Sequence, residues 1–94
     1  MITAIVMITA EVHRITEVAE VIAQVPGVSE VYSTTGEFDL VAIVRVRAHE
    51  ELAEVIPGNL NKVAGVTGTE THIAFRTYSK HDLEAAFSIG LGDA

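Results

Sequence analysis

The sequence predicts one α+β domain with the element order βαββαβ. Three observations support this prediction. Apolar residues recur with strand-like and helix-like spacing in that order along the 94 residues. The chain matches itself after a fixed shift, which indicates a doubled βαβ unit. Two of the four predicted strands are apolar on both faces, which is typical of strands in the middle of a sheet.

The internal repeat divides the chain into two halves. A shift of 38 residues places Ala4 on Ala42 (42 − 4 = 38) and aligns a strand, the end of a helix and the turn that follows it. The other matched positions are Ile5, Val6, Ile8, Ala10, Ile22, Val25, Gly27 and Val28 on Ile43, Val44, Val46, Ala48, Leu60, Val63, Gly65 and Val66. We therefore expect the two halves to fold alike.

The first half is predicted to contain a strand over residues 2–9, a helix over residues 12–25 and a strand over residues 28–35. Apolar residues at helical spacing indicate the helix. A Pro-Gly pair at residues 26–27 ends it. A turn at Gly36-Glu37 then leads into the second half.

The second half is predicted to contain the same elements, followed by a short helix. They are a strand over residues 38–47, a helix over residues 50–63, a strand over residues 66–78 and a helix over residues 81–87. Proline removes a backbone hydrogen bond inside a helix, so we expect a kink or a break into two short pieces at Pro57-Gly58. Gly65 ends the broken helix.

The burial patterns predict the strand order. The strands over residues 2–9 and 38–47 are apolar on both faces and therefore central. The strands over residues 28–35 and 66–78 alternate with polar residues, which is typical of sheet edges. Two right-handed βαβ units with these central strands give a ferredoxin-like sandwich, in which the antiparallel sheet has the order 4-1-3-2.

Both helices of such a sandwich cover the same face of the sheet and leave the other face open. The chain is 49% hydrophobic, and the central strands are apolar on the open face too. A domain of this size buries only roughly 60–65% of its unfolded surface. We therefore expect a second copy to cover the open face, giving a homodimer of the dimeric α/β-barrel type and a ring of such dimers.

The composition disfavours several classes of function. The net charge is −7 and the six basic residues are scattered, so we expect no direct contact with nucleic acid. The chain has no cysteine, which removes disulfides and thiolate metal sites. No apolar run approaches the ~20 residues of a membrane span, and the first residues lack the basic start of a signal peptide. We expect a soluble, cytoplasmic protein.

The sequence offers little support for catalysis. The four histidines fall in no spacing typical of metal ligands. The serines occupy no nucleophile elbow, and no glycine-rich phosphate loop is present. We expect a protein that is not an enzyme and that has no catalytic residues, no metal and no cofactor.

Four short motifs occur in a characteristic order. They are Pro26-Gly27-Val28, Val31-Tyr32, Thr35-Gly36-Glu37-Phe38-Asp39 and Gly65-Val66-Thr67-Gly68-Thr69-Glu70-Thr71. Together they resemble the effector domain of the Lrp/AsnC transcription regulators, also called the regulation-of-amino-acid-metabolism (RAM) domain. The pattern of that family is a PGV turn, a tyrosine shortly after it, a T-G-D-x-D hairpin and a GV-x-x-T-x-T strand. The resemblance covers nearly the whole chain.

The resemblance implies a domain that binds an amino-acid effector. Regulators of this family also carry an N-terminal winged helix-turn-helix, which these 94 residues lack. We therefore expect residues 1–94 to be a stand-alone effector domain, with full-length Lrp/AsnC-type regulators as a further partner. Glu37 stands where the family usually has aspartate, so the amino acid that binds is left open.

The predicted ligand site combines the hairpin with the fourth strand. Relatives bind effectors near this hairpin, at contacts between dimers, so we expect the hairpin of one chain to meet the fourth strand of a neighbour. Paired carboxylates at Glu37 and Asp39 suit an ammonium group, and threonine hydroxyls suit a carboxylate. The candidate residues are Thr34, Thr35, Gly36, Glu37, Asp39, Thr69, Thr71 and His72.

The residues by themselves also allow simpler interpretations. Gly36 can serve as a turn residue with positive φ, and the two acids can be solvated turn residues. Threonines form strands well, and a histidine on a strand is often a surface residue. Two other functions stay open as well. One is a small dimeric ferredoxin-like enzyme, of the monooxygenase or isomerase type, and the other is an interaction domain without a ligand.

Overall fold

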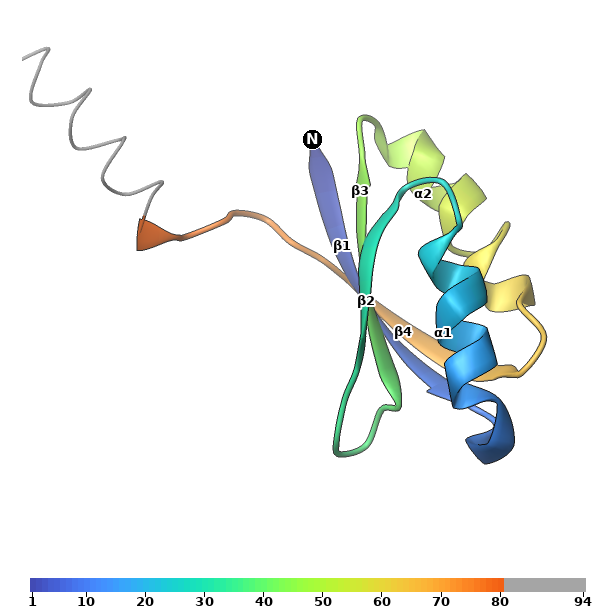
Figure 1. Ribbon diagram of the computed structural model, residues 1–94. Coiled ribbons are helices and arrows are strands. Elements are labelled where there is room, and N and C mark those ends of the chain that lie inside the picture. The colour runs from blue at the N-terminus through green and yellow to red at the C-terminus, as the bar shows by residue number, and fades with distance from the viewer. Residues whose placement is uncertain (81–94) are drawn as a thin grey trace, which may run out of the picture.

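The computed structural model describes residues 1–80 as a four-stranded antiparallel sheet with helices on one face (Figure 1). The elements are β1 (Ile2–Ala10), η1 (Val12–Arg14), α1 (Ile15–Ala23), β2 (Val28–Ser33), β3 (Leu40–Val46), α2 (His49–Val55), η2 (Leu60–Lys62) and β4 (Val66–Ile73). The strand order β2-β3-β1-β4 is the predicted order 4-1-3-2 read from the other edge. The ferredoxin-like prediction is therefore confirmed. The helix predicted over residues 81–87 lies outside the described residues.

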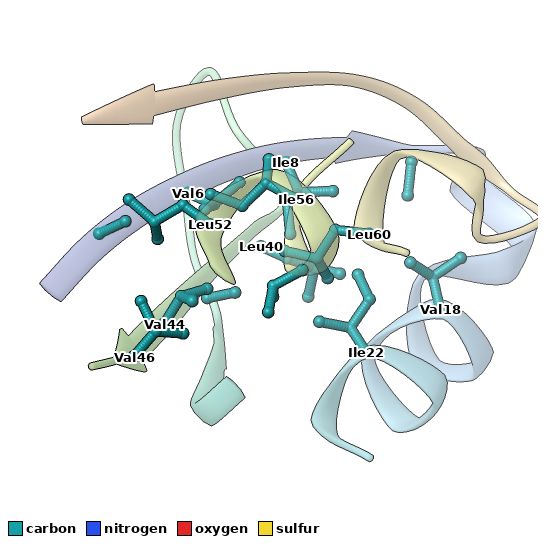
Figure 2. Packing of buried hydrophobic residues seen from close by; sticks show 14 residues of the cluster. Val6, Ile8, Val18, Ile22, Leu40, Val44, Val46, Leu52, Ile56 and Leu60 are labelled. Atoms are coloured by element: carbon teal, nitrogen blue, oxygen red, sulfur yellow. The ribbon is translucent and has the colours of Figure 1, made fainter. Parts of the chain in front are cut away.

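The core lies between the sheet and the helices. Every second side chain of β1 and β3 points into it, as the register shows by pairing Val6 with Ala42 and Ile8 with Leu40. Val18 and Ile22 of α1 close the core from the other side and are 1% and 0% exposed (Figure 2). The buried cluster consists of Ala4, Val6, Ile8, Ala10, Val18, Ile22, Leu40, Ala42, Val44, Val46, Leu52, Val55, Ile56 and Leu60.

The second helix breaks where the sequence predicts. The α-helix ends at Val55, and the chain resumes as a 3₁₀ turn at Leu60. Pro57 cannot continue the helix, and a Cβ at Gly58 would overlap the carbonyl group of Glu54. The side-chain amide of Asn59 donates to that same carbonyl at 3.0 Å, so the broken end has a hydrogen-bond partner.

The two halves of the repeat share one turn geometry. Gly27 and Gly65, 38 residues apart (65 − 27 = 38), have φ values of 99° and 98°. A Cβ at Gly27 would lie 2.8 Å from Val55 of α2, and one at Gly65 would lie 2.7 Å from Val18 of α1. Each turn therefore packs closely against the helix of the other half, which requires glycine for its conformation and for its small size.

The predicted boundaries were wrong in three parts of the chain. The first helix starts with the 3₁₀ turn Val12–Arg14, and its α-helical part is Ile15–Ala23 rather than residues 12–25. The hairpin connection spans residues 34–39 instead of a tight turn at residues 36–37, because β2 ends at Ser33 and β3 begins at Leu40. The fourth strand ends at Ile73 rather than at residue 78, because the chain leaves the sheet shortly after Ile73.

No helix covers the second face of the sheet within residues 1–80 (Figure 1). Its centre is apolar, since Ile5 is paired with Ile43 and Met7 with Val41 across β1 and β3. All four side chains are only partly exposed. We call the face of the sheet that carries these four residues the open face. None of the helices in residues 1–80 has the length and apolar character that crossing a membrane requires.

Candidate ligand site

The hairpin and the start of β4 lie at the same end of the sheet within one chain. The Thr34 N–H donates to the Asp39 carbonyl at 3.0 Å, and the Asp39 N–H donates to the Ile8 carbonyl at 2.9 Å. The next residue of β1, Thr9, is paired with Gly68 of β4. Neighbouring strands lie about 4.8 Å apart, so β1 separates the hairpin from β4 by about 10 Å. A small ligand can therefore span this end of the sheet.

The tip of the hairpin is open. Gly36 has a φ of 98°, and no atom lies within 4 Å of the place where its Cβ would stand. The glycine is therefore required by the backbone conformation and not by crowding. The Glu37 side chain beside it is exposed and, within residues 1–80, has no hydrogen-bond or ion-pair partner. Its charge is free to meet a ligand.

Two of the predicted hairpin residues have structural partners. The Asp39 carboxylate accepts the backbone N–H of Ala10 through Oδ2 at 2.9 Å, and this bond is partly buried. The Thr34 hydroxyl donates to the Phe38 carbonyl at 2.9 Å and closes the loop. Both side chains help to shape the hairpin, while Thr35 is exposed beside Gly36.

The predicted residues of β4 divide between the two faces of the sheet. Thr69 and Thr71 are paired with Ile8 and Val6 and therefore share the helix-covered face. His72 is paired with Ile5 and lies on the open face. Its Nε2 lies 2.7 Å from Glu70 Oε2. The fold thus brings the hairpin to the same end of the sheet as Thr69, and it does not bring His72 together with Thr69.

A cluster of polar groups at the start of β4 was missed by the sequence reasoning. Thr69 Oγ1 donates to Asn61 Oδ1 at 2.8 Å, and Thr67 Oγ1 donates to Thr9 Oγ1 at 3.0 Å. These groups border a small groove of about 210 Å³, lined by Asn61 and residues 66–69. The signal was Thr9 near the end of a mostly apolar first strand, together with Gly68 in the facing strand. A Cβ at Gly68 would stand 3.0 Å from Thr9 Oγ1.

Charged pairs border the open face on both edge strands. On β2, the Tyr32 hydroxyl donates to Glu30 Oε2 at 2.7 Å. The other carboxylate oxygen, Glu30 Oε1, lies 3.5 Å from Nη1 of Arg45 on β3. The hydrogen bond to Glu30, together with the negative charge of Glu30, raises the pKa of the Tyr32 phenol above its ordinary value. On β4, Glu70 and His72 form the matching pair. The open face is therefore an apolar centre between two polar edges.

No three histidine, aspartate or glutamate side chains of residues 1–80 are grouped in a way that could hold a metal ion. The chemistry of the described site is therefore that of carboxylates, hydroxyls and backbone amides. Such groups bind a polar organic molecule by hydrogen bonds and charge.

Known proteins are similar to this chain in sequence and in fold. The family model described as the Lrp/AsnC ligand binding domain matches residues 3–83. The HTH-type transcriptional regulator FL11 of Pyrococcus horikoshii is 32% identical over 77 residues, a stretch that covers 82% of this chain and 50% of FL11. The chain thus spans about half the length of such relatives.

Solved structures agree with these matches. TTHA0845 from Thermus thermophilus is 46% identical, with a TM-score of 0.80 over 85% of this chain and 100% of that one. The transcriptional regulator NMB0573 from Neisseria meningitidis, solved in complex with L-Met, shares the fold at 14% identity, with a TM-score of 0.75 over 83% of this chain and 52% of that one. The predicted family is confirmed: this chain belongs to the Lrp/AsnC family and contains its ligand-binding domain.

Proposed function

We propose that this domain binds a free amino acid and, as a homo-oligomer, passes that signal to transcription regulators of the Lrp/AsnC type. The observation that carries the proposal is the match of residues 3–83 to the ligand-binding domain of that family. Its relatives are named as transcriptional regulators, so the role is regulatory rather than enzymatic and belongs in the cytoplasm. Full-length regulators of the family, or a second copy of this chain, are the partners.

The amino acid binds at the end of the sheet, where the hairpin of one chain meets β4 of a neighbour. Glu37 and Asp39 supply negative charge for the ammonium group, and Gly36 lets the ligand approach the backbone of residues 34–37. Hydroxyls of Thr69 and Thr71 suit the carboxylate. NMB0573, which has the same fold, was solved with L-Met, so the fold accommodates an amino acid in that protein.

Self-association uses the open face. Ile5, Met7, Val41 and Ile43 form an apolar centre that a second copy can cover in a sheet-on-sheet dimer. Further contacts between dimers, as in a ring, then place the hairpin of one chain against β4 of another. An apolar face with polar edges is the composition typical of a protein interface.

A ferredoxin-like enzyme is less well supported. Such an enzyme needs a polar cavity between the helices and the sheet. The side chains of β1 and β3 that point there include Val6, Ile8, Leu40 and Val44, and each is 0% exposed in a packed apolar core. This packing favours a binding domain over a catalytic one.

A thermal-shift screen against the twenty standard amino acids tests the proposal. A ligand at 100 times its dissociation constant stabilises the folded state by about 2.7 kcal/mol, which raises the melting temperature by several degrees for a domain of this size. At least one amino acid should produce this shift. If none does at millimolar concentration, amino-acid sensing is wrong and the interaction domain without a ligand is favoured.

A further inference from the structure

The groove at the start of β4 is lined by uncharged residues. It has a volume of about 210 Å³, and its walls come from Asn61 and residues 66–69, which read Val-Thr-Gly-Thr. Pockets that enclose a whole ligand are usually larger, at roughly 300–1,000 Å³. The groove therefore suits one end of a small molecule, and hydrogen bonds rather than ion pairs must select that end.

Both threonine hydroxyls of the groove have already committed their protons. Thr69 Oγ1 donates to Asn61 Oδ1 at 2.8 Å, and Thr67 Oγ1 donates to Thr9 Oγ1 at 3.0 Å. Thr9 Oγ1 in turn donates to the Gly68 carbonyl at 3.3 Å, which fixes the direction of this chain of hydrogen bonds. A hydroxyl has one proton and two lone pairs. Thr67 and Thr69 therefore offer a ligand only acceptor lone pairs.

Asn61 offers the donor. Its Oδ1 accepts the Thr69 proton, whereas its exposed Nδ2 has no hydrogen-bond partner within residues 1–80. The Asn61 backbone N–H donates to the Ile56 carbonyl at 2.9 Å, and the neighbouring Leu60 is fully buried in the core. The 3₁₀ turn η2 therefore holds a donor beside two acceptors before a ligand binds, which lowers the entropic cost of binding.

This arrangement is complementary to a primary amide. The oxygen of an amide accepts from Asn61 Nδ2, and its NH2 group donates to Thr69 Oγ1. A carboxylate of the same shape would set an oxygen against the acceptor oxygen of Thr69. An ammonium group would find no negative charge among the lining residues, and an apolar group would leave the donor and the acceptors without partners.

We infer that the effector of this domain is an amino acid with a side-chain amide, glutamine or asparagine, and that Asn61 and Thr69 select it. The inference rests on the amino-acid binding proposed above and narrows its ligand. Thr71 lies on the same face of β4 two residues further on, about 6.6 Å from Thr69. Its hydroxyl remains for the α-carboxylate, while the hairpin of a neighbouring chain binds the ammonium group.

Calorimetry with three neutral amino acids tests the selection. Methionine is close to glutamine in length but has no amide. An amide gains two hydrogen bonds in the groove, so the wild type should bind glutamine or asparagine about tenfold or more tightly than methionine. Glutamate and aspartate, which have the shapes of the two amides, should also bind more weakly than those amides.

A double variant tests whether the groove is responsible. Asn61→Leu/Thr69→Val removes the donor and the acceptor and nearly keeps the shapes of both side chains, so it should abolish the preference for an amide over methionine. The control Thr16→Val/Gln24→Leu makes the same kind of change at exposed positions of α1 and its C-terminal end and should keep the preference. If circular dichroism shows that the double variant is unfolded, Asn61→Leu alone, at an exposed position, should lower the preference.

The outcomes separate this inference from the proposed function. If no amino acid binds the wild type, amino-acid sensing fails and the amide selection fails with it. If an amino acid without an amide binds as tightly as glutamine and asparagine, amino-acid binding stands and the amide selection is overturned. A preference for an amide that persists in the folded groove variants would also overturn the role of Asn61 and Thr69.

Discussion

The Asp39 carboxylate accepts the backbone N–H of Ala10 at 2.9 Å and thereby ties the β2–β3 hairpin to the end of β1. An acid that the family resemblance implies as a ligand for an ammonium group is thus also a structural acceptor. The two roles can be separated by substitution. Asparagine keeps an acceptor oxygen and removes the charge, whereas alanine removes both.

Asp39→Ala should destabilise the fold, because the partly buried N–H of Ala10 would lose its acceptor. We expect Asp39→Ala to lower the free energy of unfolding by about 1–3 kcal/mol. Asp39→Asn, which keeps an acceptor oxygen, should lower it much less. Urea denaturation at one fixed protein concentration measures both. Glu37→Gln, at the exposed hairpin tip, is the control and should be neutral. Equal losses for Asp39→Ala and Asp39→Asn would contradict the structural role of the acceptor.

Two glycines allow a matched test of packing. Gly36 and Gly65 both have a φ of 98°, so alanine brings similar backbone strain at either position. A Cβ at Gly65 would lie 2.7 Å from Val18 Cγ2, whereas one at Gly36 meets no atom within 4 Å. Gly65→Ala should therefore cost about 1–3 kcal/mol more than Gly36→Ala in thermal or urea unfolding. Val18→Ala is destabilising by itself because Val18 is buried, so the cost of Gly65→Ala is measured again in the Val18→Ala background. That cost should be smaller than in the natural background, and an unchanged cost would show that the overlap is not the cause.

The strand order and the core could be predicted from the sequence because they depend on which strands are apolar on both faces and which alternate with polar residues. Residues such as Val6 and Val44 are apolar within strands that are apolar on both faces, so only a central position suits them. The break of the second helix could also be predicted, since Pro57 is incompatible with a helix interior. Each of these properties resides in a few neighbouring residues.

The ends of the hairpin and of the fourth strand could not be predicted, because they depend on pairing between distant residues. Residues 74–78 have strand propensity, but pairing with β1 ends near Thr3, so the chain leaves the sheet. The role of Asp39 as the acceptor for Ala10 depends on the β1–β3 register. The division of Thr71 and His72 between opposite faces follows from alternation, but their surroundings depend on the neighbouring elements.

A charge in the middle of the open face should prevent self-association. Met7→Lys places an ammonium group between Val41 of β3 and Glu70 of β4, where a second copy would have to bury it. We expect light scattering to give the mass of a monomer at concentrations at which the wild type is a dimer. Val21→Lys on α1, where Val21 is 52% exposed, adds the same charge outside the proposed interface. A dimeric Met7→Lys protein would place the interface elsewhere.

Tyr32 should ionise above the ordinary tyrosine pKa of about 10, because its hydroxyl donates to Glu30 and the negative charge of Glu30 opposes the phenolate. The chain has two tyrosines, so Tyr78→Phe protein isolates Tyr32 in an alkaline titration followed by tyrosinate absorbance. Glu30→Gln should lower the titration midpoint, and Glu20→Gln should not change it. The interaction stabilises the fold below the unfolded pKa of Tyr32, and this contribution is lost as the pH rises through the raised pKa.

The ligand site is tested by Asp39→Asn once the screen has found an amino acid that binds. The substitution keeps the acceptor for Ala10 and removes one charge near the ammonium group. Loss of a charge-assisted hydrogen bond costs about 1.5–3 kcal/mol, so the dissociation constant should rise about 10- to 150-fold in calorimetry. Glu37→Gln should weaken binding in the same direction, because the Glu37 carboxylate is free of partners among residues 1–80. Glu20→Gln, which removes a charge from the outer surface of α1, is the control. Unchanged affinity in folded Asp39→Asn and Glu37→Gln proteins would move the site away from the hairpin.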